Sequence, residues 1–289
     1  MPFSFFKQRK NVLVLSSGAA RGLAHLGALR FFLESGVEFD AVIGSSIGAI
    51  VGAYFALYRE IEGLIDFALD IDWKKLLQAL DVNIVNVAKG GVVSGSKSAE
   101  LLKRVFGNSD FAELKIPFAC VATDISDGRP VVINEGNILD ALRASYSIPG
   151  IFVPVNRDGR FLIDGGVSSP VPVEQAMSLW GEGLSFWVVN VLSSPPRMEQ
   201  KSNAVWNVIS NIYGGHNSFS PSILDVLTQS VFIMESSIAS AQSSRAHILV
   251  DPDTSSVHFM DFTKAKELVF IGYKTAFRRV QSAKKQKTP

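Results

Sequence analysis

The feature that most constrains the fold is the stretch at residues 41–50, where an apolar run breaks at a glycine and resumes after two serines. The short apolar segment before the break and the longer one after it predict a β-strand that turns directly into an α-helix. Gly44 and Gly48 each lie two residues from Ser46, where a Cβ would crowd a tight turn. The stretch therefore predicts a Gly-x-Ser-x-Gly turn with Ser46 at its apex.

Such a turn is a candidate site for a nucleophile. Its strained backbone pushes the hydroxyl of Ser46 out of the sheet, and the unpaired N–H groups at the start of the following helix favour an anion formed beside it. The pattern is common by chance, so an ordinary strand followed by a loop of small residues is the alternative interpretation.

An earlier stretch has a similar organisation. Residues 11–16 are apolar without alternation, which is typical of a strand buried on both faces, and residues 23–33 have helical spacing. The loop between them is not a Walker phosphate loop, which needs Gly-Lys-Ser/Thr where this chain has Arg21 and Gly22, and the dinucleotide pattern Gly-x-Gly-x-x-Gly is absent. Two interpretations of this loop remain: an oxyanion hole built from backbone N–H groups, or an ordinary tight turn. Two successive strand–helix units predict a parallel sheet.

A third candidate is an aspartate at the end of a strand. Asp164 is the first polar residue after the apolar run at 161–163, and Gly165 and Gly166 free the backbone behind it. Open α/β sheets place functional side chains at strand ends, although a simple turn aspartate before two glycines is the alternative.

A serine hydroxyl needs a base to act as a nucleophile at neutral pH. In an α/β-hydrolase the base is a histidine that follows the serine and the acid along the chain, an order that His216 and His258 fit. Asp164 is the alternative, as a direct partner of Ser46 through a hydrogen bond of about 2.6–3.2 Å. The chain has four histidines in all: His25, His216, His247 and His258.

Further elements follow from periodicity and turn signals. We expect helices at 59–80, 99–106, 140–147, 173–180, 204–213, 223–241 and 262–280, and strands at 116–123, 130–133, 151–155, 160–163, 185–191 and 247–250.

Composition excludes several classes of protein. The chain has 289 residues, of which 47% are hydrophobic and 19% charged, so it can bury a large core. A net charge of +1 gives no reason to expect a nucleic-acid partner. The single cysteine, Cys120, lies in an apolar run, which indicates a buried thiol in a reducing compartment.

The two ends of the sequence bear on localisation. Residues 1–10 place apolar side chains before the charges, the reverse of a signal peptide, so we expect a cytoplasmic protein. The basic residues near the other end predict a solvated helix end, with peripheral contact to an anionic membrane as the alternative. They are Arg278, Arg279, Lys284, Lys285 and Lys287.

Three stretches, in this order, resemble the motifs of bacterial patatin-like phospholipases. Residues 17–22 are similar to the family's Gly-Gly-Gly-x-Arg/Lys-Gly loop, residues 44–48 to its Gly-x-Ser-x-Gly turn, and residues 164–166 to its Asp-Gly-Gly/Ala motif. Residues 144–155 resemble its Ser-Ile-Pro segment. The resemblance spans about residues 11–192 and, more loosely, the C-terminal helices.

The resemblance implies an α/β fold, a three-layer sandwich with a mainly parallel central sheet. It implies one domain over residues 1–289, with a catalytic core at about 11–192 and a helical part at about 200–283. The implied activity is that of an acyl hydrolase acting on lipid or other acyl esters without a metal or cofactor. Ser46 is the implied nucleophile and Asp164 its base.

In the same resemblance, the backbone N–H groups of Gly18 and Ala19 form the oxyanion hole, while Arg21 and Gly22 support the loop. Ser17 and Ala19 stand where the family has glycines. A positive φ at either position would cost on the order of 1 kcal/mol and tilt a donor.

Two other functions stay open from sequence: a non-catalytic regulatory or lipid-binding protein on the same fold, and an acyltransferase that passes the acyl group to an acceptor other than water. The head group, acyl length and oligomeric state are left open as well.

Overall fold

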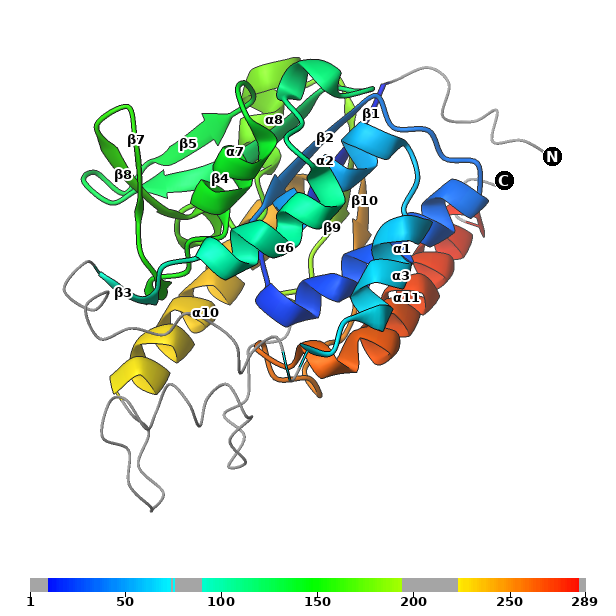
Figure 1. Ribbon diagram of the computed structural model, residues 1–289. Coiled ribbons are helices and arrows are strands. Elements are labelled where there is room, and N and C mark those ends of the chain that lie inside the picture. Colours follow the sequence, from blue (N-terminus) through cyan, green and yellow to red (C-terminus); the bar gives the residue numbers. More distant parts are fainter. Residues whose placement is uncertain (1–9, 74, 76–89, 194–222, 286–289) are drawn as a thin grey trace.

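The computed structural model describes residues 10–73, 75, 90–193 and 223–285, which form a central sheet covered by helices on both faces (Figure 1). The strand order is β10-β9-β1-β2-β4-β8-β7, and β5 pairs with β4. The strands are β1 (Asn11–Leu15), β2 (Ala41–Ser45), β4 (Phe118–Asp124), β5 (Pro130–Ile133), β7 (Val155–Arg157), β8 (Arg160–Asp164), β9 (Ser185–Val189) and β10 (Ile248–Val250). A separate pair joins β3 (Gly91–Val93) to β6 (Gly150–Phe152).

Most of the helices that the sequence predicts are present in the structure. They are α1 (Ala24–Glu34), α2 (Ile47–Tyr58), α3 (Glu62–Asp70), α6 (Ser96–Phe106), α7 (Ile138–Ser145), α8 (Val173–Trp180), α10 (Ile223–Gln242) and α11 (Ala265–Lys285). The helix expected at 204–213 lies outside the described residues.

The sheet has a parallel and an antiparallel part. Every neighbouring pair from β10 through β9, β1 and β2 to β4 is parallel, whereas β5, β8 and β7 add to it in antiparallel fashion. In β1, Leu13 and Leu15 enter one core while Val12 and Val14 enter the other. This explains why the strand reads as apolar without alternation.

The two cores define the layers. The larger one lies between the sheet and α1, α2, α3, α6, α7 and α11, and the smaller one between the sheet and α8 with the end of α10. Helices α1, α3 and α11 lie side by side (Figure 1). The expected three-layer α/β sandwich with a mainly parallel sheet is confirmed. Cys120 is buried as expected.

The helix expected at 59–80 is wrong in its extent. Helix α3 ends at Asp70 and the backbone of Ile71 is extended. The ring of Trp73 stacks on Phe262 with centroids 4.8 Å apart, and its Nε1–H donates to the Ala68 carbonyl at 2.8 Å. A contact with a distant part of the chain thus outweighs the local helical pattern.

Among the described helices, none combines the length and the apolar content needed to cross a bilayer.

Candidate active site

Ser46 occupies a strained turn between β2 and α2. Its backbone lies at φ 55° and ψ −123°, a conformation that is costly for a residue with a side chain. A Cβ on Gly44 would lie 2.3 Å from the carbonyl of Gly48, and one on Gly48 would lie 2.5 Å from the Leu15 oxygen. The turn can close this tightly because both positions lack a side chain, as the sequence pattern predicts.

The hydroxyl of Ser46 is paired with Asp164. It donates a hydrogen bond of 2.6 Å to Oδ2 of Asp164, across 118 residues of sequence. The N–H of Gly166 donates to the other carboxylate oxygen at 2.7 Å. Ser46 is 4% exposed and Asp164 2% exposed. The two residues singled out from separate motifs therefore form one buried pair.

The position of Asp164 comes from a strand that runs against the parallel sheet. In the ladder between β4 and β8, Ala122 lies opposite Asp164, while in the neighbouring ladder Val121 lies opposite Ser45. One strand thus separates the two side chains. The prediction that Asp164 ends a strand is confirmed, and because β8 is antiparallel to β4, this strand reaches the carboxyl end of β2 from the opposite direction.

Burial changes the acidity of Asp164. Loss of solvent raises its pKa to about 7, although the hydrogen bonds from Ser46 and Gly166 act in the opposite direction. A carboxylate with a pKa near the working pH is a much stronger base than an exposed aspartate.

The loop at residues 16–21 has two unused donors. Four of its N–H groups donate to backbone carbonyls: Ser16 to Val189, Ser17 to Pro170, Ala20 to Phe259 and Arg21 to Gly18. Within the described chain, the N–H groups of Gly18 and Ala19 donate to no acceptor. They are therefore available to an oxyanion.

The two positions where the family's glycines are replaced behave differently. Ala19 has φ 47°, so its side chain costs on the order of 1 kcal/mol there. Ser17 is not among the described residues with positive φ, so its side chain adds no backbone strain. Gly18, at φ 147°, keeps the conformation that favours glycine.

Arg21 and Gly22 join this loop to the rest of the molecule. The buried guanidinium of Arg21 donates to the Val257 carbonyl at 2.8 Å. Burial lowers the pKa of Arg21, and the charge of Asp253 acts against that shift. A Cβ on Gly22 would lie 2.0 Å from the side chain of Ile47, the residue after Ser46. These contacts are consistent with the predicted supporting role.

The sequence analysis missed two further side chains of the site. The N–H of Ser46 donates to Oγ of Ser145 at 3.0 Å, and that hydroxyl donates to the Val121 carbonyl at 2.7 Å. The carboxyl group of Glu235, on α10, accepts a hydrogen bond from the hydroxyl of Ser17 at 2.8 Å. A glutamate within the apolar run of α10 is the signal that could have revealed it.

The described histidines are engaged elsewhere. Nε2 of buried His25 lies 2.9 Å from the Ser16 carbonyl, and burial lowers its pKa to about 4. His247 accepts from the N–H of Phe186, and His258 from that of Met260. His216 lies outside the described residues. In the described chain, Asp164 is the side chain that the Ser46 hydroxyl contacts.

The described residues contain no group of three or more His, Cys, Asp or Glu side chains that could hold a metal ion.

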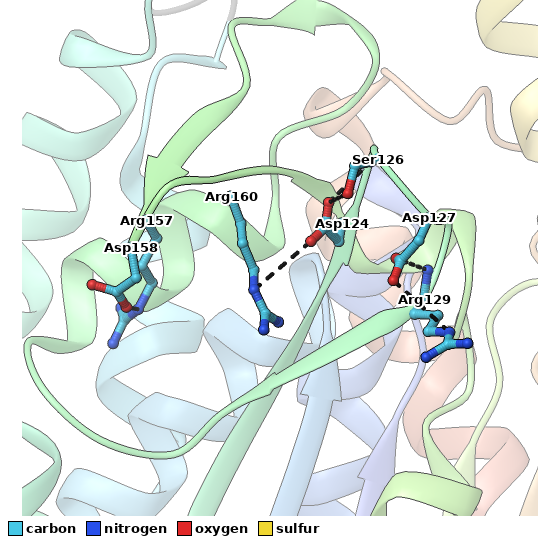
Figure 2. A network of polar contacts seen from close by, with 7 residues as sticks. All are labelled: Asp124, Ser126, Asp127, Arg129, Arg157, Asp158 and Arg160. Carbon is cyan, nitrogen blue, oxygen red and sulfur yellow. Dashed lines mark hydrogen bonds and ion pairs between the residues drawn. The ribbon is translucent and has the colours of Figure 1, made fainter.

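A second aspartate ends β4, just before an exposed turn at residues 125–129. Asp124 accepts hydrogen bonds from the N–H and hydroxyl of Ser126 at 2.9 and 2.6 Å, and Nε of Arg160 lies 3.9 Å away (Figure 2). These contacts hold the pKa of Asp124 below its usual value. A cavity of about 280 Å³ lies beside this network, lined by residues 131–135 together with Arg157, Asp158, Arg160 and Leu162, and it does not include the pair Ser46–Asp164.

Residues 13–177, more than half of the chain, match the family model described as patatin-like phospholipase. The chain belongs to the patatin-like phospholipase family. Within it, an uncharacterized NTE family protein of Mycobacterium tuberculosis is 35% identical over 161 residues, covering 56% of this chain and 44% of that protein. The lysophospholipase NTE1 of Chaetomium globosum is 25% identical over 273 residues, covering 91% of this chain and 18% of that protein.

The chain spans less than half the length of these curated patatin-like relatives. Among solved structures, VipD from Legionella pneumophila has the same kind of fold, with a TM-score of 0.53 at 14% identity over 95% of this chain and 67% of that one.

Proposed function

We propose that this patatin-like protein is a serine acyl hydrolase that cleaves lipid esters through an acyl-enzyme. The observation that carries the proposal is the 2.6 Å hydrogen bond from the Ser46 hydroxyl to the buried carboxylate of Asp164. The free N–H groups of Gly18 and Ala19, in the loop that follows the neighbouring strand β1, support it.

The reaction follows from these groups. Oγ of Ser46 attacks the ester carbonyl while Asp164 takes the hydroxyl proton, and the N–H groups of Gly18 and Ala19 bind the resulting oxyanion. Collapse of this intermediate expels the alcohol, which takes the proton from Asp164. Water then attacks the acyl-enzyme, Asp164 accepts one of its protons, and the acid leaves as Ser46 is reprotonated.

A buried apolar cluster packs around Ala19, one of the two proposed oxyanion donors. It comprises Ala19, Val93, Ile148, Ile151, Phe232, Phe259 and Met260. Because a lysophospholipase is among the relatives, we propose a substrate of the phospholipid or lysophospholipid class. We further propose a cytoplasmic protein with peripheral contact to the membrane, which the exposed Arg278 and Arg279 on α11 favour.

Labelling and turnover together test the proposal. A fluorophosphonate probe is expected to label wild type and not Ser46→Ala, and wild type is expected to hydrolyse a short-chain p-nitrophenyl ester. A panel of phospholipids and lysophospholipids then identifies the preferred head group. Absence of labelling and turnover would favour the non-catalytic lipid-binding alternative, and transfer to an added alcohol acceptor would identify an acyltransferase.

A further inference from the structure

Helix α10 contributes a buried carboxyl group that the proposed reaction does not use. Glu235 is 3% exposed, although Ile233 and Met234 beside it are 48% and 55% exposed. Its Oε2 accepts the hydrogen bond from the Ser17 hydroxyl at 2.8 Å. Ser17 directly precedes Gly18, whose N–H is one of the two free donors.

The same carboxyl group lies behind the Asp-Gly-Gly motif. A Cβ on Gly166 would lie 2.6 Å from Oε1 of Glu235 and 2.7 Å from Oγ of Ser17. Gly166 in turn donates its N–H to Asp164 at 2.7 Å. Glu235 therefore lies against both segments of the proposed site, and it fits there because residue 166 has no side chain.

We propose that Glu235 is a positioning residue of the hydrolase, which holds the Ser17 hydroxyl and thereby fixes the direction of the N–H groups of Gly18 and Ala19. This inference rests on the proposed function. It also gives a function to Ser17, which stands where the family has glycine. The hydroxyl of Ser17 donates the hydrogen bond that joins the loop to Glu235 of α10. A buried hydroxyl–carboxyl pair with both partners satisfied restricts the loop to one arrangement.

The charge state of Glu235 matters for the same reason. Burial, and then the charge of Asp164, raise the pKa of Glu235 well above its usual range. No Lys or Arg of the described chain forms an ion pair with it. Because the charge of Asp164 raises the pKa of Glu235, ionisation of one of these two carboxyl groups opposes ionisation of the other.

Other ionisable groups on the elements that pack against α10 are directed elsewhere. Arg21 of the loop donates to Val257, and Arg245 in the turn Ser243–Arg245 is exposed. His258 stacks on Phe259, which packs on Phe232 of α10. Strand β6, also against α10, has no ionisable side chain.

At high pH, ionised Glu235 adds a second negative charge close to the oxyanion and opposes its formation.

Kinetics with a p-nitrophenyl ester separate positioning from a merely structural role. Glu235→Leu is expected to lower kcat about 10- to 100-fold, part of the loss caused by removing one oxyanion donor, with little change in KM. Ser17→Ala is expected to lower kcat in the same way. Unchanged kcat in both variants, or a rise in KM alone, would overturn the proposal.

A double-mutant cycle tests whether Glu235 acts through Ser17. If it does, the combined variant Ser17→Ala/Glu235→Leu is no slower than the slower single variant, because the two substitutions break one contact. Losses that multiply would contradict it.

Glu235→Gln provides a folded variant with a specific signature. Its amide oxygen can still accept from Ser17, but the side chain cannot ionise, so the alkaline fall in kcat/KM that we expect of wild type should be absent. Glu267→Gln, an exposed carboxyl on α11, is the matched control and should keep the wild-type profile. An alkaline limb that persists in Glu235→Gln would overturn the role of this carboxyl.

Failure of the inference and failure of the proposed function give different results. Wild type that hydrolyses the ester and reacts with the fluorophosphonate, with Glu235 variants that match the control, would refute the positioning role alone. Wild type without labelling or turnover would refute the hydrolase and the inference with it.

Discussion

Asp164 and Asp124 end neighbouring strands and differ in almost everything else. Asp164 is enclosed, its partners are the Ser46 hydroxyl and the Gly166 N–H, and burial raises its pKa to about 7. Asp124 lies where β4 meets its turn, and Ser126 and the exposed Arg160 lower its pKa (Figure 2). The pKa of the same side chain is thus raised or lowered according to the desolvation, the donors and the charges around it.

The backbone after each aspartate explains the difference. Asp164 is followed by Gly165 and Gly166, where the chain packs closely: a Cβ on Gly165 would lie 2.1 Å from the Val121 oxygen. Asp124 is followed by Ile125 and then by Ser126, whose N–H and hydroxyl both donate to it. The two aspartates therefore differ in their donors: Asp164 accepts from the hydroxyl of Ser46, whereas Asp124 accepts from its own turn.

The largest expected effect is the fall in kcat when Asp164 is neutralised, compared with the same substitution at Asp124. Asp164→Asn removes the proposed proton acceptor while keeping the shape, so kcat is expected to fall about 10²- to 10⁴-fold, the usual contribution of a general base. Asp124→Asn, the matched control, should keep kcat near wild type. Equal losses of kcat in both variants, measured with the same ester, would show that the two aspartates do not differ in their effect on the reaction.

A smaller effect is expected in the pH dependence of kcat/KM. Asp164 must be ionised to accept a proton, so activity should rise with pH through an apparent pKa of about 7. Asp124→Asn should leave this limb in place, since the carboxyl group at that position takes no proton from Ser46. An acid limb near the usual pKa of an aspartate, about 4, would show that Asp164 is not desolvated in solution.

The two aspartates are also expected to affect stability with opposite signs. The folded pKa of Asp164 lies above the unfolded value, so its contribution is fully present below pH of about 4 and is lost as pH rises to about 7. The folded pKa of Asp124 is lowered, so its contribution is present above pH of about 4 and lost as pH falls further. Urea unfolding of wild type and of each Asp→Asn variant at pH 3, 5 and 8 measures the contribution of each aspartate to the free energy of unfolding. A pH dependence of the same sign for the two variants would contradict the assignment.

The smallest effect is expected at Ala19. Replacing it by glycine relieves the positive φ but adds freedom to the unfolded chain, so the net gain in stability is between zero and about 1 kcal/mol. The variant tests whether the loop is strained by its departure from the family pattern. Urea unfolding gives the stability and single-turnover acylation gives the rate, and a loss of stability would indicate that Ala19 fits its position without strain.

Much of the site could be predicted from sequence because its parts are local. The turn around Ser46 and the glycines after Asp164 each need particular residues within a few positions, and such patterns are visible in a single chain. That Ser46 contacts Asp164 rather than a histidine is a tertiary fact, which the family resemblance suggested and periodicity could not.

The remainder depends on contacts between distant segments. The direction of β8 could not be predicted from its own residues, because the apolar run at 161–163 is too short to distinguish a continuous from an alternating pattern. The end of α3 is set by Trp73 meeting Phe262, and the role of Glu235 by Ser17, 218 residues away. These contacts join residues that are far apart in the sequence. They form only in the folded chain, so local sequence patterns do not predict them.

The ladder that joins β4 to β8 has a consequence for how proteins of this fold diversify. Side chains alternate along a strand, so a slip of one residue in the pairing of Ala122 with Asp164 would turn the carboxylate to the opposite face, out of reach of the serine. The exposed turns at residues 125–129 and 158–159 can therefore change in length only where this pairing and the contact of Ser145 with Ser46 are kept. These turns are places where the chain can acquire new loops without moving Ser46 or Asp164.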